Sequence, residues 1–179
     1  MNVLVIGSGG REHAICKSIL NSNLLSKLYC SPGNPGISSI ATCLSIDINN
    51  NESVLDFCKT NNINMVIVGP EIPLANGMVD YLEQGEIKAF GPTRSAAELE
   101  SSKIFMKEIC KKYNLPTAKY EEFSDPQSAL DYVSNSIYPI VIKADGLAAG
   151  KGVTIADNID DAKTAIVDCL INNKFGNSG

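Results

Sequence analysis

The junction between an apolar run and a glycine-rich segment at the start of the chain restricts its possible folds most. Residues 3–6 are Val-Leu-Val-Ile and residues 7–10 are Gly-Ser-Gly-Gly. An apolar run without polar alternation is typical of a strand that is covered on both faces, as in a parallel sheet. Glycines let the backbone bring its N–H groups close to an anion, and a helix beginning near Arg11 would add its positive dipole end. The junction predicts a strand-loop-helix unit whose loop either binds phosphate or only makes a tight turn.

This loop lacks the fingerprint of a dinucleotide-binding fold. Gly-x-Gly-x-x-Gly requires a third glycine at position 12, where the sequence has Glu12. The acidic residue expected about twenty positions further on is also missing, since residues 29–32 are Tyr-Cys-Ser-Pro. We therefore expect a phosphate but not NAD. His13, the only histidine, is close enough in sequence to touch a phosphate, but a single histidine is more often a packed, hydrogen-bonded side chain.

The charge balance and the cysteine pattern exclude several classes of protein. With 15 basic and 20 acidic residues the net charge is −5, which gives no basic footprint for nucleic acid or an anionic membrane. No apolar run is long enough to span a bilayer, and no basic region precedes the first apolar run as in a signal peptide. The six cysteines are scattered singly, without Cys-x-x-Cys. This pattern indicates reduced packing residues in a cytoplasmic protein.

Strand and helix patterns alternate from residue 1 to about residue 92. Alternation at this spacing predicts a doubly wound parallel sheet, in which ligands bind beyond the carboxyl ends of the strands. Three loops rich in Gly or Pro leave those ends, at residues 7–12, 31–36 and 69–77. In the third loop Glu71 is either a solvated carboxylate or a hydrogen-bond partner for a sugar hydroxyl or an amine.

Residues 91–116 are predicted to form two short helices that end before Pro116. Ser101 and Ser102 can cap the second helix, and Lys103 stands at its start. A cation is unfavourable there, by roughly 0.3–1 kcal/mol, because the helix dipole is positive at its N-terminus. Lys103 is therefore a candidate anion contact.

A second unit follows this connector. The expected elements are strands at residues 120–123, 138–143 and 152–156 and helices at residues 126–135 and 160–172. The loop at residues 143–152, Lys-Ala-Asp-Gly-Leu-Ala-Ala-Gly-Lys-Gly, is similar to a Walker A loop. Its glycine spacing differs and a strand follows it, so it is expected to form a hairpin that folds over a polyphosphate as a flap.

The two lysines of this loop are expected to differ. Lys143 ends a very apolar strand and is predicted to be partly buried, where a cation needs an anionic partner. Lys151 lies in the loop itself and is expected to be solvated. A solvated hairpin with surface lysines would explain Lys151 but not Lys143.

A family resemblance rests on five segments in order: VLVIGSGGREHA, SPGNPG, VIVGPEIPLANG, FGPTRSAAELESSKIFMK and YPIVIKADGLAAGKGV. Together they resemble the phosphoribosylamine-glycine ligases, which are ATP-grasp enzymes of purine biosynthesis. The resemblance implies that glycine is ligated to 5-phosphoribosylamine through a glycyl phosphate, giving glycinamide ribonucleotide, ADP and phosphate. It also implies ATP with Mg²⁺ or Mn²⁺, and small-molecule partners without nucleic acid or membrane.

The resemblance also implies domains and site residues. Residues 1–100 would form a Rossmann-like N-terminal domain, and residues 101–179 the opening part of an ATP-grasp domain. The implied phosphoribosylamine contacts are Gly7, Ser8, Gly9, Gly10, Arg11 and Glu71. The implied nucleotide contacts are Lys103, Lys143, Asp145, Gly146, Leu147, Ala148, Ala149, Gly150, Lys151 and Gly152.

One substitution follows from the phosphate reading of the glycine loop. Val at Gly9 is expected to block the phosphate, because its side chain fills the space of the anion and disfavours a positive φ. The fold is expected to survive, because the preceding strand supplies the buried surface.

Members of the resembled family are much longer than this chain. The resemblance therefore implies that the catalytic residues and metal ligands lie beyond Gly179, and no metal ligand is assigned within the chain. We expect an incomplete fragment that is inactive by itself. Two alternatives are a non-catalytic nucleotide- or phosphoribosyl-binding module, and another ATP-grasp enzyme of the same pathway with a different acceptor.

Overall fold

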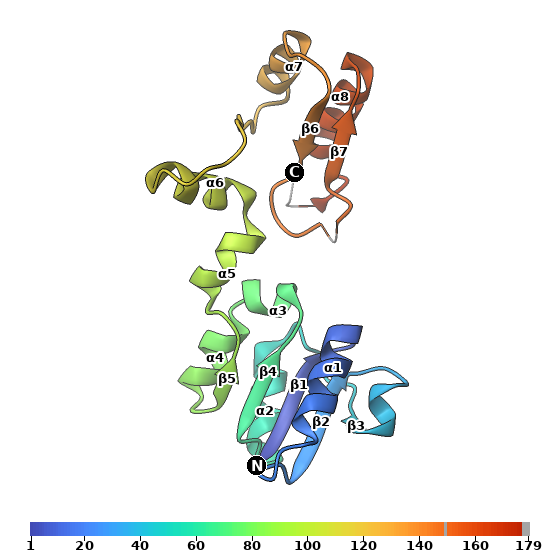
Figure 1. Ribbon diagram of the computed structural model, residues 1–179, viewed down its shortest axis with the longest axis vertical. Coiled ribbons are helices and arrows are strands. Elements are labelled where there is room, and N and C mark those ends of the chain that lie inside the picture. The colour runs from blue at the N-terminus through green and yellow to red at the C-terminus, as the bar shows by residue number, and fades with distance from the viewer. Residues whose placement is uncertain (149, 177–179) are drawn as a thin grey trace. The chain divides into compact units, whose positions relative to one another are not determined.

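The computed structural model describes residues 1–148 and 150–176 (Figure 1). The chain divides into two compact units, Met1–Ala97 and Glu98–Gly179, and each is described by itself. The division falls within helix α5 (Arg94–Ser101), inside the stretch that the sequence predicts to be a helical connector.

The first unit is built on a five-stranded sheet with the order β3-β2-β1-β4-β5. Its strands are β1 (Asn2–Gly7), β2 (Lys27–Pro32), β3 (Thr42–Cys43), β4 (Met65–Val68) and β5 (Lys88–Phe90). All neighbouring strands run parallel, and the central strand β1 pairs with β2 on one side and β4 on the other. The predicted parallel sheet is confirmed.

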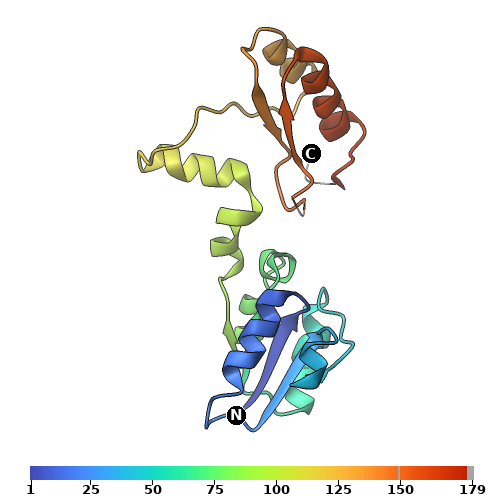
Figure 2. The same ribbon diagram turned by 45° about the vertical axis from the view of Figure 1, so that its right-hand side comes forward.

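Helices cover both faces of this sheet (Figure 2). They are α1 (Gly10–Ile19), α2 (Asn51–Thr60), α3 (Glu71–Ala75) and α4 (Met78–Gln84), with a 3₁₀ turn η1 (Ile37–Ser39). Leu4 and Ile6 belong to a buried cluster with α2 and α4, whereas Val3 and Val5 belong to one with α1. Successive side chains of β1 are therefore buried on opposite faces, which explains why its apolar run has no polar alternation.

The second unit contains an antiparallel hairpin of β6 (Ile140–Lys143) and β7 (Val153–Ala156). Its helices are α6 (Lys103–Lys112), α7 (Pro126–Ser134) and α8 (Ile159–Ile166), which continues as the π-helical segment η2 (Val167–Ile171). The hairpin and these helices occur where the sequence predicts them. The strand expected at residues 120–123 is wrong. No described strand pairs with this segment, and Phe123 packs on Tyr132 with ring centroids 5.1 Å apart.

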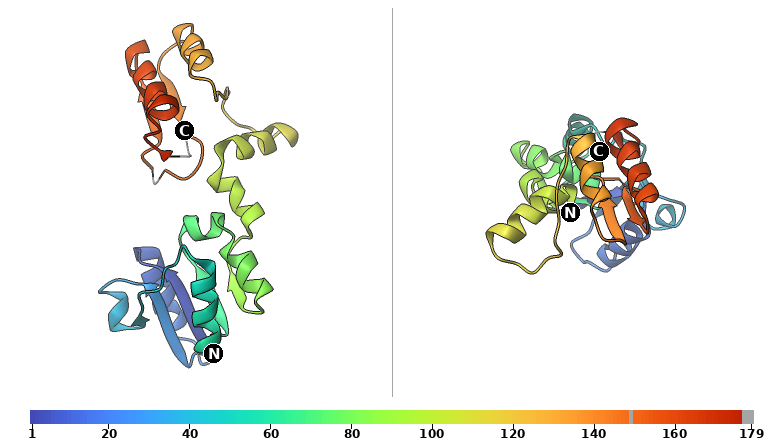
Figure 3. Two further views of the ribbon diagram at one scale, coloured as in Figure 1. Left: turned by 180° about the vertical axis from the view of Figure 1, so that it is seen from behind. Right: turned by 90° about the horizontal axis from the view of Figure 1, so that it is seen from above.

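The two faces of the hairpin differ. Ile140 and Ile142 pack in a cluster with α7 and α8, which cover one face (Figure 3). Because side chains alternate along a strand, Val141 and Ile155 point to the other face, where they are 54% and 67% exposed. Within the described part of this unit, that second face stays open to solvent.

Candidate functional site

The candidate phosphoribosyl site lies at the carboxyl edge of the parallel sheet. Its loops follow β1, β2 and β4, where helices on the two faces begin to diverge and α/β proteins bind ligands. The backbone N–H of Gly33 donates to the Gly7 carbonyl at 3.0 Å, and that of Gly69 to the Ile6 carbonyl at 3.0 Å. The Asn34 amide also donates to the Ser8 carbonyl at 2.8 Å. The structure thus brings together the three loops that the sequence predicts to meet.

Glu12 occupies the centre of these loops and was missed as a site residue. It is only 4% exposed, and its carboxylate accepts a hydrogen bond from the Gly9 N–H at 2.6 Å. A second bond comes from Nε of Arg11 at 3.1 Å. The available signal was the spacing, because a glutamate at the third helical position often bonds back to the N-cap amide. The mismatch of Glu12 with the dinucleotide fingerprint does not by itself indicate this role.

Arg11 and Glu71 form the exposed rim of the site. Nη2 of Arg11 donates to Glu71 Oε1 at 3.0 Å and to the Gly69 carbonyl at 2.5 Å, so the first and third loops are joined by one side chain. A backbone N–H and the Arg11 guanidinium hold the pKa of the Glu71 carboxyl below its ordinary value. Both side chains are substantially exposed, at 58% and 42%, so this pair adds little to stability and is open to a ligand.

The glycine loop differs from expectation at two residues. Gly7 is buried with φ +131°, so it forms the turn after β1 and does not face solvent, whereas Ser8, Gly9 and Gly10 are exposed. Gly9 has φ −84°, so the expectation of a positive φ is wrong. Its N–H is bonded to Glu12. A Cβ at Gly9 would lie 2.9 Å from Glu12 Oε2, so a valine there would require the Glu12 carboxylate to shift.

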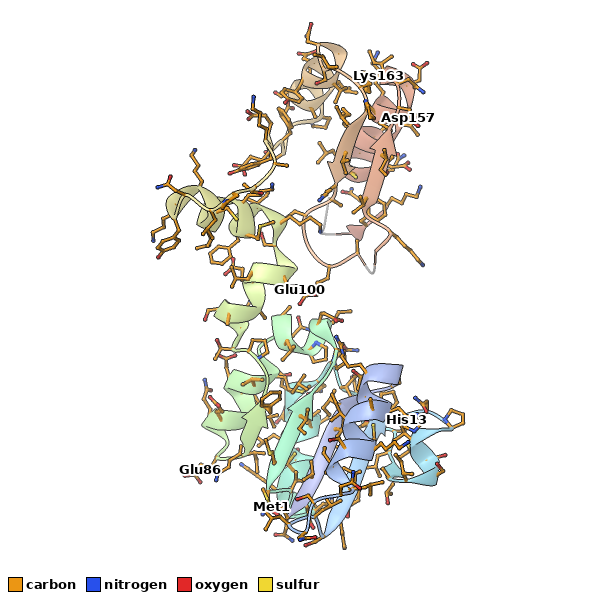
Figure 4. All side chains as sticks on the ribbon, in the orientation of Figure 1. Met1, His13, Glu86, Glu100, Asp157 and Lys163 are labelled. Atoms are coloured by element: carbon orange, nitrogen blue, oxygen red, sulfur yellow. The ribbon has the colours of Figure 1, made fainter. Side chains whose placement is uncertain are left out.

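His13 packs against the second loop. Figure 4 labels this side chain on α1, and a Cβ added to Gly36 would lie 2.7 Å from His13 Cε1. His13 is partly buried. These contacts favour the packing interpretation of the single histidine.

In the second unit the flap loop is tied to helix α6 through Asp145. The Asp145 carboxylate accepts hydrogen bonds from the backbone N–H groups of Lys103 at 2.5 Å and Ile104 at 3.1 Å. Ser102 caps the same helix as predicted, accepting from Phe105 N–H at 3.0 Å. A carboxylate at a helix N-terminus offsets the unfavourable position of the Lys103 charge. Asp145 therefore caps helix α6 in this structure, and its implied contact with the nucleotide stays a prediction.

Lys103 connects the start of helix α6 to the flap loop through two hydrogen bonds. Its Nζ donates to the Gly146 carbonyl at 2.8 Å, while its backbone N–H donates to Asp145. The ammonium group of Lys103 thus binds a loop carbonyl, and its contact with a bound anion stays a prediction.

Replacing Asp145 by Ala is expected to destabilise the second unit by about 1–2 kcal/mol, the typical loss for a helix-capping carboxylate. Urea unfolding followed by circular dichroism measures this change. Asp157→Ala is the matched control, because Asp157 is exposed and precedes α8 by two residues. An equal loss in both variants would contradict the capping role.

Lys143 is exposed, so its predicted burial is wrong. Strand alternation directs Ile140 and Ile142 to the packed face of the hairpin and places Lys143 with Val141 on the open face. Lys151 is also exposed. Burial therefore gives no reason to rank one of these lysines above the other as a nucleotide contact.

The flap loop is closed by small residues. The Ala144 N–H donates to the Gly152 carbonyl at 2.8 Å, and Gly146 and Gly150 have φ values of +83° and +76°. A Cβ at Gly152 would lie 2.7 Å from that of Ala148, so a larger residue would widen the loop. Leu147 is partly buried within the same loop. Ala149, also expected to contact the nucleotide, lies outside the described residues.

Cys30 supports the first loop of the site, because its Sγ donates to the Gly7 carbonyl at 3.3 Å. Burial raises the pKa of the Cys30 and Cys58 thiols to about 12, so both stay protonated at neutral pH. Within residues 1–148 and 150–176, no group of three or more His, Cys, Asp or Glu side chains could hold a metal ion. No helix in the same residues has the length and apolar character needed to cross a bilayer.

A parallel α/β sheet with loops at its carboxyl edge, followed by a hairpin with a glycine-rich loop, places the chain in the ATP-grasp class of proteins. The chain belongs to the phosphoribosylglycinamide synthetase family. The family model of the N domain matches residues 1–100, and that of the ATP-grasp (A) domain matches residues 101–179.

Individual relatives agree with this membership. The chain is 49% identical over its whole length to the phosphoribosylamine–glycine ligase of Rhizobium meliloti and 48% identical to that of Neisseria meningitidis. It spans 42% of the length of each of these two relatives. The crystal structure of the Thermotoga maritima phosphoribosylamine–glycine ligase superposes with a TM-score of 0.76 at 28% identity, over 99% of this chain and 41% of that one.

A fold likeness extends to a second solved structure. N5-carboxyaminoimidazole synthase from Aspergillus clavatus, solved with ADP and 5-aminoimidazole ribonucleotide, has a TM-score of 0.68 at 22% identity. It matches 94% of this chain and 43% of its own. At this identity the likeness concerns the fold alone.

Proposed function

We propose that this chain is part of an ATP-dependent ligase that joins glycine to 5-phosphoribosylamine, giving glycinamide ribonucleotide, ADP and phosphate in purine biosynthesis. The observation that carries the proposal is the match of two consecutive family domains, which together cover residues 1–179 in order. Relatives at 48–49% identity bear the name of this ligase, and this chain spans 42% of their length. The first unit would bind the phosphoribosylamine and the second would contribute to the ATP site.

The phosphate of the substrate would lie at the N-terminus of α1. The exposed loop residues Ser8 and Gly10 precede or begin this helix, where backbone N–H groups and the helix dipole favour an anion. Arg11 carries five N–H donors, and its described bonds use Nε and Nη2. Nη1 is therefore directed to no described partner and is suited to a phosphate oxygen.

Glu71 would bind the sugar part of the substrate. Its carboxylate lies 3.0 Å from Nη2 of Arg11, beside the proposed phosphate position, and its depressed pKa keeps it ionised at neutral pH. An ionised carboxylate accepts hydrogen bonds from ribose hydroxyls or from an ammonium group. Arg11 and Glu71 thus provide complementary charges for the two ends of one small ligand.

The flap loop would cover the polyphosphate of ATP. Lys143 and Lys151 are exposed at the two ends of the loop, and Gly146 and Gly150 adopt the left-handed conformations that leave backbone N–H groups accessible. The family implies a divalent metal with the nucleotide. The described residues offer no metal cluster, so none of them is assigned to that ion.

Replacement of Arg11 by Gln is expected to weaken the binding of ribose 5-phosphate roughly tenfold, the lower range for losing a charge-assisted hydrogen bond. Isothermal titration of the 179-residue chain measures this affinity. Lys17→Gln removes an exposed positive charge from the last turn of the same helix and should leave the affinity unchanged. Parent-like affinity in the Arg11 variant, or no ribose 5-phosphate binding by the parent chain, would contradict the proposed site.

A further inference from the structure

Three glycines from two different loops surround the buried carboxylate of Glu12. A Cβ at Gly7 would lie 2.5 Å from Glu12 Cγ, and one at Gly9 would lie 2.9 Å from Glu12 Oε2. The three atoms nearest to a Cβ at Gly69 all belong to Glu12, with Cγ at 2.7 Å and Cδ at 2.8 Å. Real Cβ atoms do not approach so closely, so all three positions leave room for the same side chain.

The carboxylate of Glu12 also organises the polar groups around it. A buried carboxylate is costly unless it is hydrogen-bonded, and this one accepts from Gly9 N–H at 2.6 Å and Arg11 Nε at 3.1 Å. With Nε fixed in this way, Nη2 of Arg11 reaches the Gly69 carbonyl and Glu71. One buried side chain therefore holds the first loop, the third loop and the guanidinium between them.

We propose that Glu12 is the positioning residue of the phosphoribosyl site. It locks the loops after β1 and β4 together and aims Arg11 at the ligand, without touching the ligand itself. The need for glycine at positions 9 and 69 then comes from the volume of Glu12 and not from the close approach of a phosphate. The ligand part of this inference rests on the proposed function, whereas the locking of the loops does not.

A suppression experiment tests the steric part. Gly69→Ala is expected to lower the melting temperature of the first unit by about 4 °C or more, because overpacking of this kind costs about 1–3 kcal/mol. In a Glu12→Ala background the same Gly69→Ala change should have almost no further effect, since the three atoms nearest to the new Cβ are gone. Gly69 has no positive φ that would penalise alanine by itself. Equal losses in both backgrounds would overturn the proposal.

Gly10 provides the matched glycine control. A Cβ at Gly10 meets no atom within 4 Å, and Gly10 is the first residue of α1. Gly10→Ala should therefore leave the melting temperature unchanged or raise it slightly, with or without Glu12. A loss as large as that of Gly69→Ala would show that the loop rejects any side chain, and would overturn the role given to Glu12.

The conservative variant Glu12→Gln tests the positioning part. Its amide keeps the shape and can still accept from Gly9 N–H, but it loses the charge that holds Arg11. We expect a melting temperature closer to the parent than that of Glu12→Ala, together with about tenfold weaker ribose 5-phosphate binding. Parent-like binding would overturn the positioning role while leaving the site itself intact. Absence of ribose 5-phosphate binding in the parent would instead overturn the proposed function, and the suppression experiment would still decide whether Glu12 locks the loops.

Discussion

The 179-residue chain is expected to form no detectable glycinamide ribonucleotide from ATP, glycine and 5-phosphoribosylamine. Phosphoryl transfer depends on cations that are held around the transferring group in a site that excludes water. In the described residues the hairpin face that carries Lys143 is open, with Val141, Val153 and Ile155 between 46% and 67% exposed. A charge pair 4 Å apart contributes about 1 kcal/mol in water and about 4 kcal/mol at an effective dielectric constant near 20. On a face that is open to water, the charge of Lys143 therefore stabilises a transferring phosphoryl group much less than it would in a closed site.

Product formation measured against a protein-free control checks this expectation. Ribose 5-phosphate binding by the same preparation serves as the folding control, because the loops of its proposed site all belong to the first unit. Turnover above the protein-free rate would show that residues 1–179 suffice for the reaction. That result would contradict the assignment of the missing catalytic contacts to the part of the relatives that this chain does not span.

Replacing Ile6 by Ala is expected to lower the free energy of unfolding of the first unit by about 2–5 kcal/mol. Ile6 is completely buried in β1 and packs in the cluster that contains α2 and α4, so the shorter side chain leaves a cavity in the core. A small domain has only about 5–15 kcal/mol of total stability, so this loss is a large share of it. Urea unfolding followed by circular dichroism gives the difference.

Ile72 is the control for this substitution within the same unit. It is 54% exposed on the short helix α3, and alanine has the higher helix propensity, so Ile72→Ala should change stability by no more than about 0.5 kcal/mol. Similar losses at Ile6 and Ile72 would mean that β1 is not the buried centre of the sheet.

Local signals in the sequence were sufficient for most of the fold. The unbroken apolar run at residues 3–6 predicted a strand buried on both faces, and the structure places it at the centre of a parallel sheet. Ser102 was expected to cap the second connector helix, and its side chain accepts the expected backbone hydrogen bond. These features depend on residues within a few positions of each other. The strand expected at residues 120–123 failed because a strand also needs a partner, which its own sequence does not specify.

The sequence by itself determined which segments become strands, helices and loops, and that three loops meet at one edge of the sheet. Only the tertiary structure decided which residues of those loops contact one another and which are buried. Arg11 contacts Gly69 and Glu71, 58 and 60 positions away, and Asp145 caps a helix that begins 42 positions earlier. The burial of Glu12 and the exposure of Lys143 likewise depend on which neighbours pack beside them. The physical reason is that hydrophobic period and turn composition act over a few residues, whereas hydrogen-bond partners and burial arise between segments that the folded chain brings together.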